Sequence, residues 1–365
     1  MSARSTFGIT LALDPEGVAR TGAGLRTWLS SGTCQSPSGA FVAWCDLTAS
    51  SRSYDYPEIT GYALTFLAGQ TSLSERECAV GQRAADWLTA RVRTGALAAR
   101  DGWDNNAIYL FDLGMIASGL LSFGRRTEVE RYLETGLQLA NFLRRETSST
   151  KSISPVSRHG PRSRRVGWSS RGVAHLGKLC QALLLADEVE GRAYGSGSAR
   201  LIATVERLQA PDGRIQTDEE GAAIMLHPHL YAAEGLWIWG SAVGDRNALE
   251  RAKTAVEWVW TQQLRDGGLP RSAPRRSKAG PALEQSDVTA QAVRLALMLG
   301  LRSAACDRAV TRLIELARNH DAGLAVVYQP GSPDQHLNTW ATLFAAQALA
   351  AATPEVAAIS WRQLV

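Results

Sequence analysis

The sequence has 365 residues, of which 45% are hydrophobic and 20% charged, and its net charge is +4. This composition excludes an intrinsically disordered chain, and so small a charge excess excludes general binding to nucleic acid. Five cysteines, an odd number without a CxxC spacing, argue against a disulfide framework or a zinc ribbon. We expect free, mostly buried thiols in a reducing compartment.

No apolar run reaches the roughly 20 residues that a membrane-spanning helix needs. The apolar run near the N-terminus, residues 7–13, is followed at once by Asp14, Pro15 and Glu16, so it makes an unconvincing secretion signal. We therefore expect a cytoplasmic protein without a membrane span, either a monomer or a homodimer.

Two kinds of helix alternate along the chain. One kind has a polar face, and the first of these begins after Asp14 and Pro15, a favourable cap and first helical residue. The other kind is rich in Ala, Gly and Leu on nearly every face, which indicates burial on most sides. The polar-faced series is expected at 15–30, 75–93, 128–145, 199–208, 247–264 and 304–319. The apolar series is expected at 58–69, 107–123, 170–189, 229–243, 287–299 and 338–352.

Glycine-centred turns precede most of the apolar helices, at Gly39, Gly102, Gly213, Gly267 and Gly323. Glycine favours chain reversals because it accepts positive φ. Six apolar helices inside six polar-faced ones predict an all-α (α/α)6 toroid, with short β-turn elements, as a single domain over 1–365. The alternative is an open helical-repeat array.

Two basic stretches interrupt the repeat, at 148–171 and 270–282. Their Pro and Ser content predicts long loops, each just before an apolar helix. We expect residues such as Arg164 and Arg165 to edge the cavity mouth and hold substrate anions. The alternative is a solvated surface loop without a partner.

Polar side chains recur where the inner helices begin. The first inner helix opens with Glu58 between Tyr56 and Tyr62, and the fifth opens with Asp287. Each acid is either a catalytic carboxylate facing the ring cavity or a group that caps its helix. Because the two acids lie two hairpins apart, we expect them to flank a substrate and share the acid–base work.

The remaining candidates occupy similar positions in the other hairpins. His229 is expected to transfer protons, and Glu234 to be a further cavity carboxylate, although structural roles stay open for both. No metal ligand set and no cofactor motif is apparent. The expected substrate-binding side chains are Tyr56, Tyr62, Asp112, Trp168, His227, Tyr231, Asn338, Trp340, Arg164 and Arg165.

The turn-then-helix repeat resembles the α/α-toroid superfamily of six-hairpin glycosidases, uronate lyases, epimerases and terpenoid cyclases. The segments 56–62, 229–236 and 286–291 resemble bacterial toroid proteins that accompany polysaccharide or sugar biosynthesis genes. Residues 285–290 also resemble the DxDDTA motif of class II terpenoid cyclases, but only Asp287 of its three acids is kept.

These observations favour a carbohydrate-active enzyme acting on an anionic sugar or glycan by general acid–base chemistry. Hydrolysis is the first expectation, and epimerisation or lyase chemistry follows closely. The alternatives are a terpenoid-cyclase-like enzyme with Asp287 as its acid, and a non-catalytic carbohydrate-binding toroid.

Overall fold

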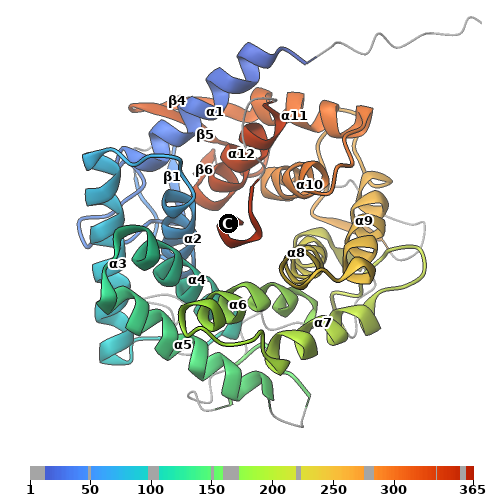
Figure 1. Cartoon of the computed structure of the whole chain (residues 1–365). Helices are drawn as coiled ribbons and strands as arrows, with labels where there is room; N and C mark the ends of the chain where they lie inside the picture. Colours follow the sequence, from blue (N-terminus) through green and yellow to red (C-terminus); the bar gives the residue numbers. More distant parts are fainter. Residues whose placement is uncertain are drawn as a thin grey trace, which may run out of the picture.

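The computed structural model describes residues 13–47, 51–97, 107–148, 152–158, 172–218, 223–274, 283–333, 335–353 and 359–365. In these residues the chain forms twelve α-helices arranged as two concentric rings (Figure 1). The outer ring consists of α1 (Pro15–Ser30), α3 (Glu75–Thr94), α5 (Glu130–Ser148), α7 (Ser196–Leu208), α9 (Arg246–Trp260) and α11 (Ala304–Leu316). The inner ring consists of α2 (Pro57–Ala68), α4 (Leu110–Thr127), α6 (Cys180–Val189), α8 (Leu226–Val243), α10 (Ser286–Met298) and α12 (Thr339–Ala352).

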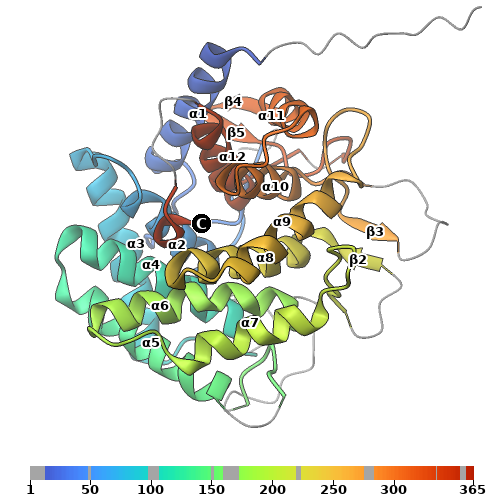
Figure 2. The same ribbon diagram turned by 45° about the vertical axis from the view of Figure 1, so that its right-hand side comes forward.

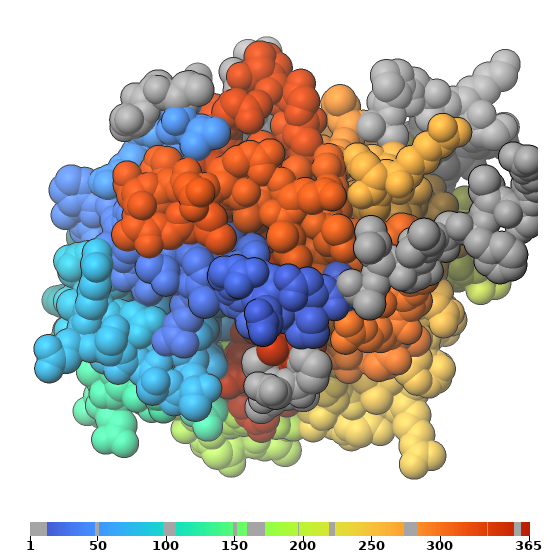
Figure 3. Space-filling model, turned by 90° about the horizontal axis from the view of Figure 1, so that it is seen from above, coloured from blue at the N-terminus to red at the C-terminus, as the bar shows by residue number. Residues whose placement is uncertain are grey.

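The ring is closed. Each inner helix contacts the next one, and α12 packs against both α1 and α2. Figure 3 shows the first helix, in dark blue, against the orange segment that precedes α12, and α1 contacts β4 (Ala317–His320), β5 (Gly323–Val326) and α11 there. The predicted (α/α)6 toroid is therefore confirmed, and the open-array alternative is excluded.

Three two-stranded antiparallel sheets lie in the connections that precede inner helices. β1 (Trp44–Asp46) pairs with β6 (His336–Asn338), which joins the first connection to the last. β2 (Ala223–Met225) pairs with β3 (Ser272–Pro274), at one side of the ring in Figure 2, and β4 (Ala317–His320) pairs with β5 (Gly323–Val326). The connections that follow inner helices are short, so the long connections gather at the rim where the inner helices begin.

Several predicted helices differ from the structure by three or four residues at an end, and in two of them another element takes the place of the predicted α-helix. The third inner helix begins as a 3₁₀ turn, η1 (Ala174–Leu179), before continuing as α6. The sixth outer helix ends at Leu316 rather than at Asn319, because its last residues form β4 instead.

Three of the predicted glycine turns are confirmed. Gly39, Gly213 and Gly267 have φ between +89° and +101°, and each packs against the backbone of the outer helix that follows it. A Cβ at Gly213 would lie 2.1 Å from the carbonyl oxygen of Thr254 in α9. These turns therefore need glycine both for the positive φ and for the close approach. Gly323 instead begins β5, and Asp321 has the positive φ in the turn before it; Gly102 lies outside the described residues.

The five cysteines are free thiols, and all but Cys78 are buried. Among the described residues, no helix combines the length and hydropathy that a membrane crossing requires. Over the same part of the chain, no group of three or more His, Cys, Asp or Glu side chains is placed to hold a metal ion.

Candidate functional site

A repeated hydrogen bond puts four inner helices in register. In each, the fourth residue of the helix accepts the backbone N–H of the residue that follows the preceding turn. The acceptors are Thr60, His229, Thr289 and Thr342, and their donors are Phe41, Ile215, Leu269 and Val326. The acceptor–donor distances are 2.9 to 3.2 Å. Equivalent positions in α2, α8, α10 and α12 can therefore be compared directly.

His229 is one of these structural acceptors. Its Nδ1 accepts from Ile215 at 3.2 Å, and its Nε2 lies 3.1 Å from the carbonyl oxygen of Ala255 in α9. The ring is fully buried, and burial lowers its pKa to about 4. Both ring nitrogens are therefore occupied on the outer side of α8. This placement corrects the expectation that His229 transfers protons in the cavity.

Two residues before each acceptor, the same four helices place Glu58, His227, Asp287 and Trp340, which we call the upper tier. The Trp340 indole donates to Asp287 Oδ2 at 3.0 Å, and His227 Nδ1 lies 3.6 Å from that same oxygen. Asp287 Oδ1 accepts from the backbone of Val288 at 2.9 Å. One carboxylate at a helix start thus joins side chains from three inner helices.

Glu58 faces this cluster from α2. The Tyr56 hydroxyl donates to Glu58 Oε2 at 2.6 Å, and the Tyr56 ring meets Trp340 edge-on with centroids 6.4 Å apart. Tyr328 packs against Trp340 as well, at 5.2 Å. The structure therefore connects the two predicted carboxylates, Glu58 and Asp287, through an aromatic contact.

Four residues after each upper-tier residue lies a middle tier, formed by Tyr62, Tyr231, Gln291 and Phe344. The Tyr62 hydroxyl donates to the Tyr231 hydroxyl at 2.8 Å, and Phe344 meets both tyrosine rings edge-on. Burial raises the pKa of both phenols well above its ordinary value. Tyr62 and Tyr231 thus form an uncharged floor beneath the upper tier.

A lower tier of charged residues lies beneath this floor. Glu234 accepts from Lys178 and from Arg294, each at 2.6 Å, and all three side chains are fully buried. Lys178 Nζ lies 5.3 Å and 5.1 Å from the ring centroids of Tyr62 and Tyr231. Although burial alone would raise it, Arg294 and Lys178 hold the pKa of Glu234 below its usual value. Glu234 is therefore a structural anion, which corrects its assignment as a catalytic residue.

Residues 361–365 close the ring behind the lower tier, where Figures 1 and 2 place the C-terminus near the centre. Lys178 Nζ donates to the Val365 carbonyl at 2.6 Å. Gln181 donates to the carbonyls of Trp361 and Leu364 at 3.0 and 2.8 Å.

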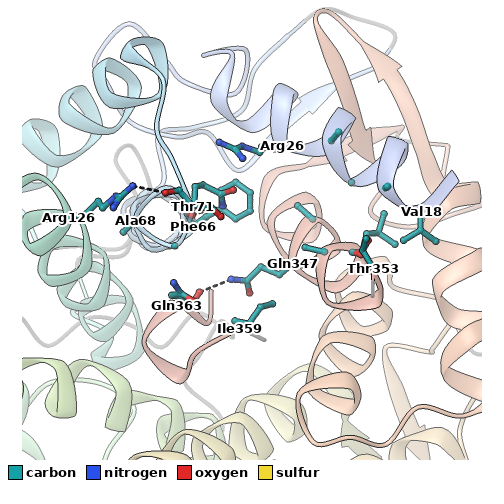
Figure 4. A pocket seen from close by; sticks show the side chains of 18 residues that line it. Val18, Arg26, Phe66, Ala68, Thr71, Arg126, Gln347, Thr353, Ile359 and Gln363 are labelled. Carbon is teal, nitrogen blue, oxygen red and sulfur yellow. Dashed lines mark hydrogen bonds between the residues drawn. The ribbon is translucent and has the colours of Figure 1, made fainter. Parts of the chain in front are cut away.

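A cavity of about 640 Å³ lies beyond this segment, between α1, α2 and α12 (Figure 4). Arg26, Arg126 and Gln347 line it, and Arg126 donates to Thr71. It adjoins the ends of the inner helices, away from Glu58 and Asp287.

The other predicted site residues have mixed outcomes. Asn338 caps α12 by accepting from Ala341 at 2.8 Å, so its capping role is observed directly. Asp112 is buried in the first turn of α4. Trp168, Arg164 and Arg165 lie outside the described residues.

Sequence reasoning missed three ring residues, which are Lys178, Gln291 and Arg294. Two of them follow Asp287 by four and seven residues, a spacing that keeps side chains on one face of a helix. That spacing was a usable signal for Gln291 and Arg294. Lys178 had none, because its partners come from other hairpins.

Known structures share this architecture. The unsaturated glucuronyl hydrolase of Bacillus sp. GL1 matches with a TM-score of 0.72 at 13% identity, covering 95% of this chain and 99% of its own. The chain has the α/α-toroid fold of six-hairpin glycosidases. A sugar epimerase from a ruminal bacterium matches with a TM-score of 0.73 at 10% identity, covering 93% and 98%. The cellobiose 2-epimerase of Bacillus thermoamylovorans matches at 0.68 and 11%, covering 90% and 98%.

No protein-family model matches this sequence, and no curated protein matches it either. At 10 to 13% identity, these three structures establish the fold alone.

Proposed function

We propose that this protein is a saccharide-processing enzyme that works by general acid–base chemistry at the upper tier. The observation that carries the proposal is the contact of His227 and Trp340 with one carboxylate, Asp287, in the ring that also holds Glu58. An upper tier made only of apolar side chains would suit a terpenoid-cyclase-like enzyme instead. Aromatic faces beside paired carboxylates suit the C–H faces and oxygens of a sugar.

His227 replaces His229 as the proton-transfer residue in this proposal. Burial lowers the pKa of His227, although Asp287 opposes the shift, so the imidazole is neutral near pH 7 and able to accept a proton. Once His227 is protonated, the Asp287 carboxylate at 3.6 Å stabilises the imidazolium. The Trp340 hydrogen bond keeps that carboxylate oriented.

Hydrolysis is the first reaction that this arrangement supports. Glu58, in its protonated form, gives its proton to the glycosidic oxygen as the C–O bond to the anomeric carbon breaks. His227 takes a proton from the attacking water, whose oxygen forms the new bond to that carbon. Proton exchange with solvent then restores both groups.

Epimerisation is the second candidate, because a neutral imidazole can remove a proton beside a carbonyl group. In that reaction His227 takes the proton from the carbon beside the carbonyl group, and an acid returns a proton to the opposite face of that carbon. The 3.6 Å approach of His227 Nδ1 to Asp287 Oδ2 supports this route, because the carboxylate stabilises the imidazolium that forms.

The test replaces each titratable group by an isosteric neutral one. Asp287→Asn and Glu58→Gln should each lower kcat by about 10²-fold or more, the scale of a positioned acid or base. Hydrolysis and epimerisation would be assayed on cellobiose and on an unsaturated glucuronyl disaccharide, the sugars that the similar structures suggest. Glu250→Gln is the matched control, since Glu250 pairs with Lys253 on the surface of α9. Full activity in both site variants would overturn the proposal.

A further inference from the structure

The middle tier contains one polar side chain that the fold leaves unsatisfied. Gln291 of α10 stands where α2, α8 and α12 carry Tyr62, Tyr231 and Phe344, so it projects into the same layer of the ring. It is fully buried, and neither Oε1 nor Nε2 has a hydrogen-bond partner among the described residues. Burying an unpaired carboxamide is costly, and buried polar groups in folded proteins are nearly always paired. Gln291 is therefore placed to bind a ligand.

Two imidazoles that pack toward Tyr231 of the middle tier, one directly and one through Phe111, share this property. His175 is 5% exposed and its Nε2 has no partner in the described part of the chain, while its ring packs against Phe111, which in turn packs on Tyr231. His227 Nδ1 also lacks a hydrogen bond, and its ring lies 4.3 Å from that of Tyr231. Burial lowers the pKa of both histidines, so both are neutral near pH 7.

The charges in the ring disfavour an anionic sugar at this depth. The upper tier carries the carboxylates Glu58 and Asp287. The cations Lys178 and Arg294 lie below the aromatic floor, and both are already bound to Glu234. A substrate carboxylate in the upper or middle tier would face the negative charge of Asp287, with no cation of either tier to offset it.

We infer that Gln291 forms the core of an inner subsite that selects a neutral sugar by hydrogen bonding to its hydroxyl groups. A carboxamide donates through Nε2 and accepts through Oε1, so it matches two neighbouring hydroxyls. His227 and Trp340 are the partly exposed members of the upper tier, so a ligand would reach Gln291 past these two side chains. This inference rests on the proposed function, and it names a neutral substrate where the basic loops alone suggested an anionic one.

The experiment uses Gln291→Met, which keeps the shape of the side chain and removes both polar atoms. Binding of D-glucose, cellobiose and D-glucuronate would be measured by titration calorimetry, and thermal stability by melting. We expect wild-type protein to bind the neutral sugars more tightly than D-glucuronate. Gln291→Met should weaken cellobiose binding by about 10-fold or more, since a site built around a hydroxyl is left incomplete.

Melting separates this role from a structural one. Gln291→Met should melt at or above the wild-type temperature, because the variant buries no unpaired amide. Gln347→Met is the matched control, since Gln347 binds Arg294, Gln363 and Val365 in the lower tier. That variant should melt below wild type.

The remaining outcomes would contradict the role of Gln291, the neutral substrate or the proposed function. Unchanged cellobiose affinity in Gln291→Met, or a lowered melting temperature, would overturn the role of Gln291 and leave the proposed function standing. Tighter binding of D-glucuronate than of D-glucose would overturn the neutral substrate. Failure of wild-type protein to bind any of the three sugars would overturn the proposed function and this inference with it.

Discussion

A single residue distinguishes α8 from its equivalents. His229 stands where α2, α10 and α12 carry Thr60, Thr289 and Thr342, and all four accept a backbone N–H from a turn. A threonine hydroxyl accepts at any ordinary pH, whereas the imidazole accepts through Nδ1 only while it is neutral. The hairpin containing α8 should therefore be the acid-sensitive one.

The pH dependence of stability tests this. Burial lowers the pKa of His229 from 6.5 to about 4, so between these values the unfolded chain binds more protons than the folded one. The stabilisation that neutral His229 gives the folded state is complete above about pH 6.5. It is lost as the pH falls toward 4, and the total loss is roughly 3 kcal/mol. His229→Thr keeps the acceptor and removes the titration, so its unfolding free energy should fall less than that of wild type between about pH 7.5 and 5 in urea titrations.

The same substitution has a cost at neutral pH. It removes the contact with Ala255 and the packing on Trp258, which should destabilise the variant by about 1–2 kcal/mol. His175 and His227 also have lowered pKa values and remain in both proteins, so only the difference between the two pH profiles is diagnostic. Parallel profiles would show that His229 does not titrate in this range.

The sequence predicts those candidate-site residues whose location follows from their position along an inner helix. Glu58, Asp287 and Trp340 were expected at the rim because each opens an inner helix, and the structure brings them together. His227 and His229 are two residues apart, so they leave the helix about 200° apart, and no composition argument says which one faces inward. Only alignment of His229 with the three threonines does.

At the level of helices, the inner ring depends on close backbone contact at glycine. A Cβ at Gly119 of α4 would lie 2.3 Å from the carbonyl oxygen of Gly61 in α2, and one at Gly235 of α8 would lie 2.5 Å from the carbonyl carbon of Gly177 in η1. The small-residue content of these helices was visible in the sequence and correctly placed them inside. Which glycines touch depends on the register between helices, which local sequence does not specify.

A pair of Gly→Ala substitutions separates packing from helix propensity. Gly119→Ala forces α2 and α4 apart, so it should destabilise the protein by about 1–3 kcal/mol or more. Gly22→Ala in α1 meets only the Leu349 Cβ, at 3.5 Å, and should be neutral or stabilise by about 0.5–1 kcal/mol through helix propensity. Melting temperatures would show opposite shifts, and an unchanged Gly119→Ala protein would contradict the proposed contact.

For the whole molecule, the repeat count predicted a closed ring, but nothing in the repeat predicted what fills its centre. Residues 361–365 belong to no hairpin, yet Trp361, Leu364 and Val365 are almost fully buried. Their carbonyls accept hydrogen bonds from the buried side chains of Lys178 and Gln181. The ring therefore packs around residues 361–365.

Removal of residues 361–365 should consequently affect the whole ring rather than one hairpin. Lys178, Gln181 and Gln347 would each lose a buried partner, at about 1–3 kcal/mol apiece, and the burial of Trp361 and Leu364 would be lost as well. This sum is comparable to the stability of a typical protein, about 5–15 kcal/mol. We expect the truncated chain to melt far below wild type or not to fold.

Two point variants keep that prediction decisive if the truncated chain does not fold. Leu364→Ala removes buried apolar atoms only and should cost about 2–5 kcal/mol. Arg362→Ala lies in the same segment, but its side chain is exposed and pairs with Glu188 at the surface, so it should cost less than about 1 kcal/mol. Equal melting temperatures for Leu364→Ala and Arg362→Ala would mean that the segment does not hold the ring centre together, because only the first of the two faces inward.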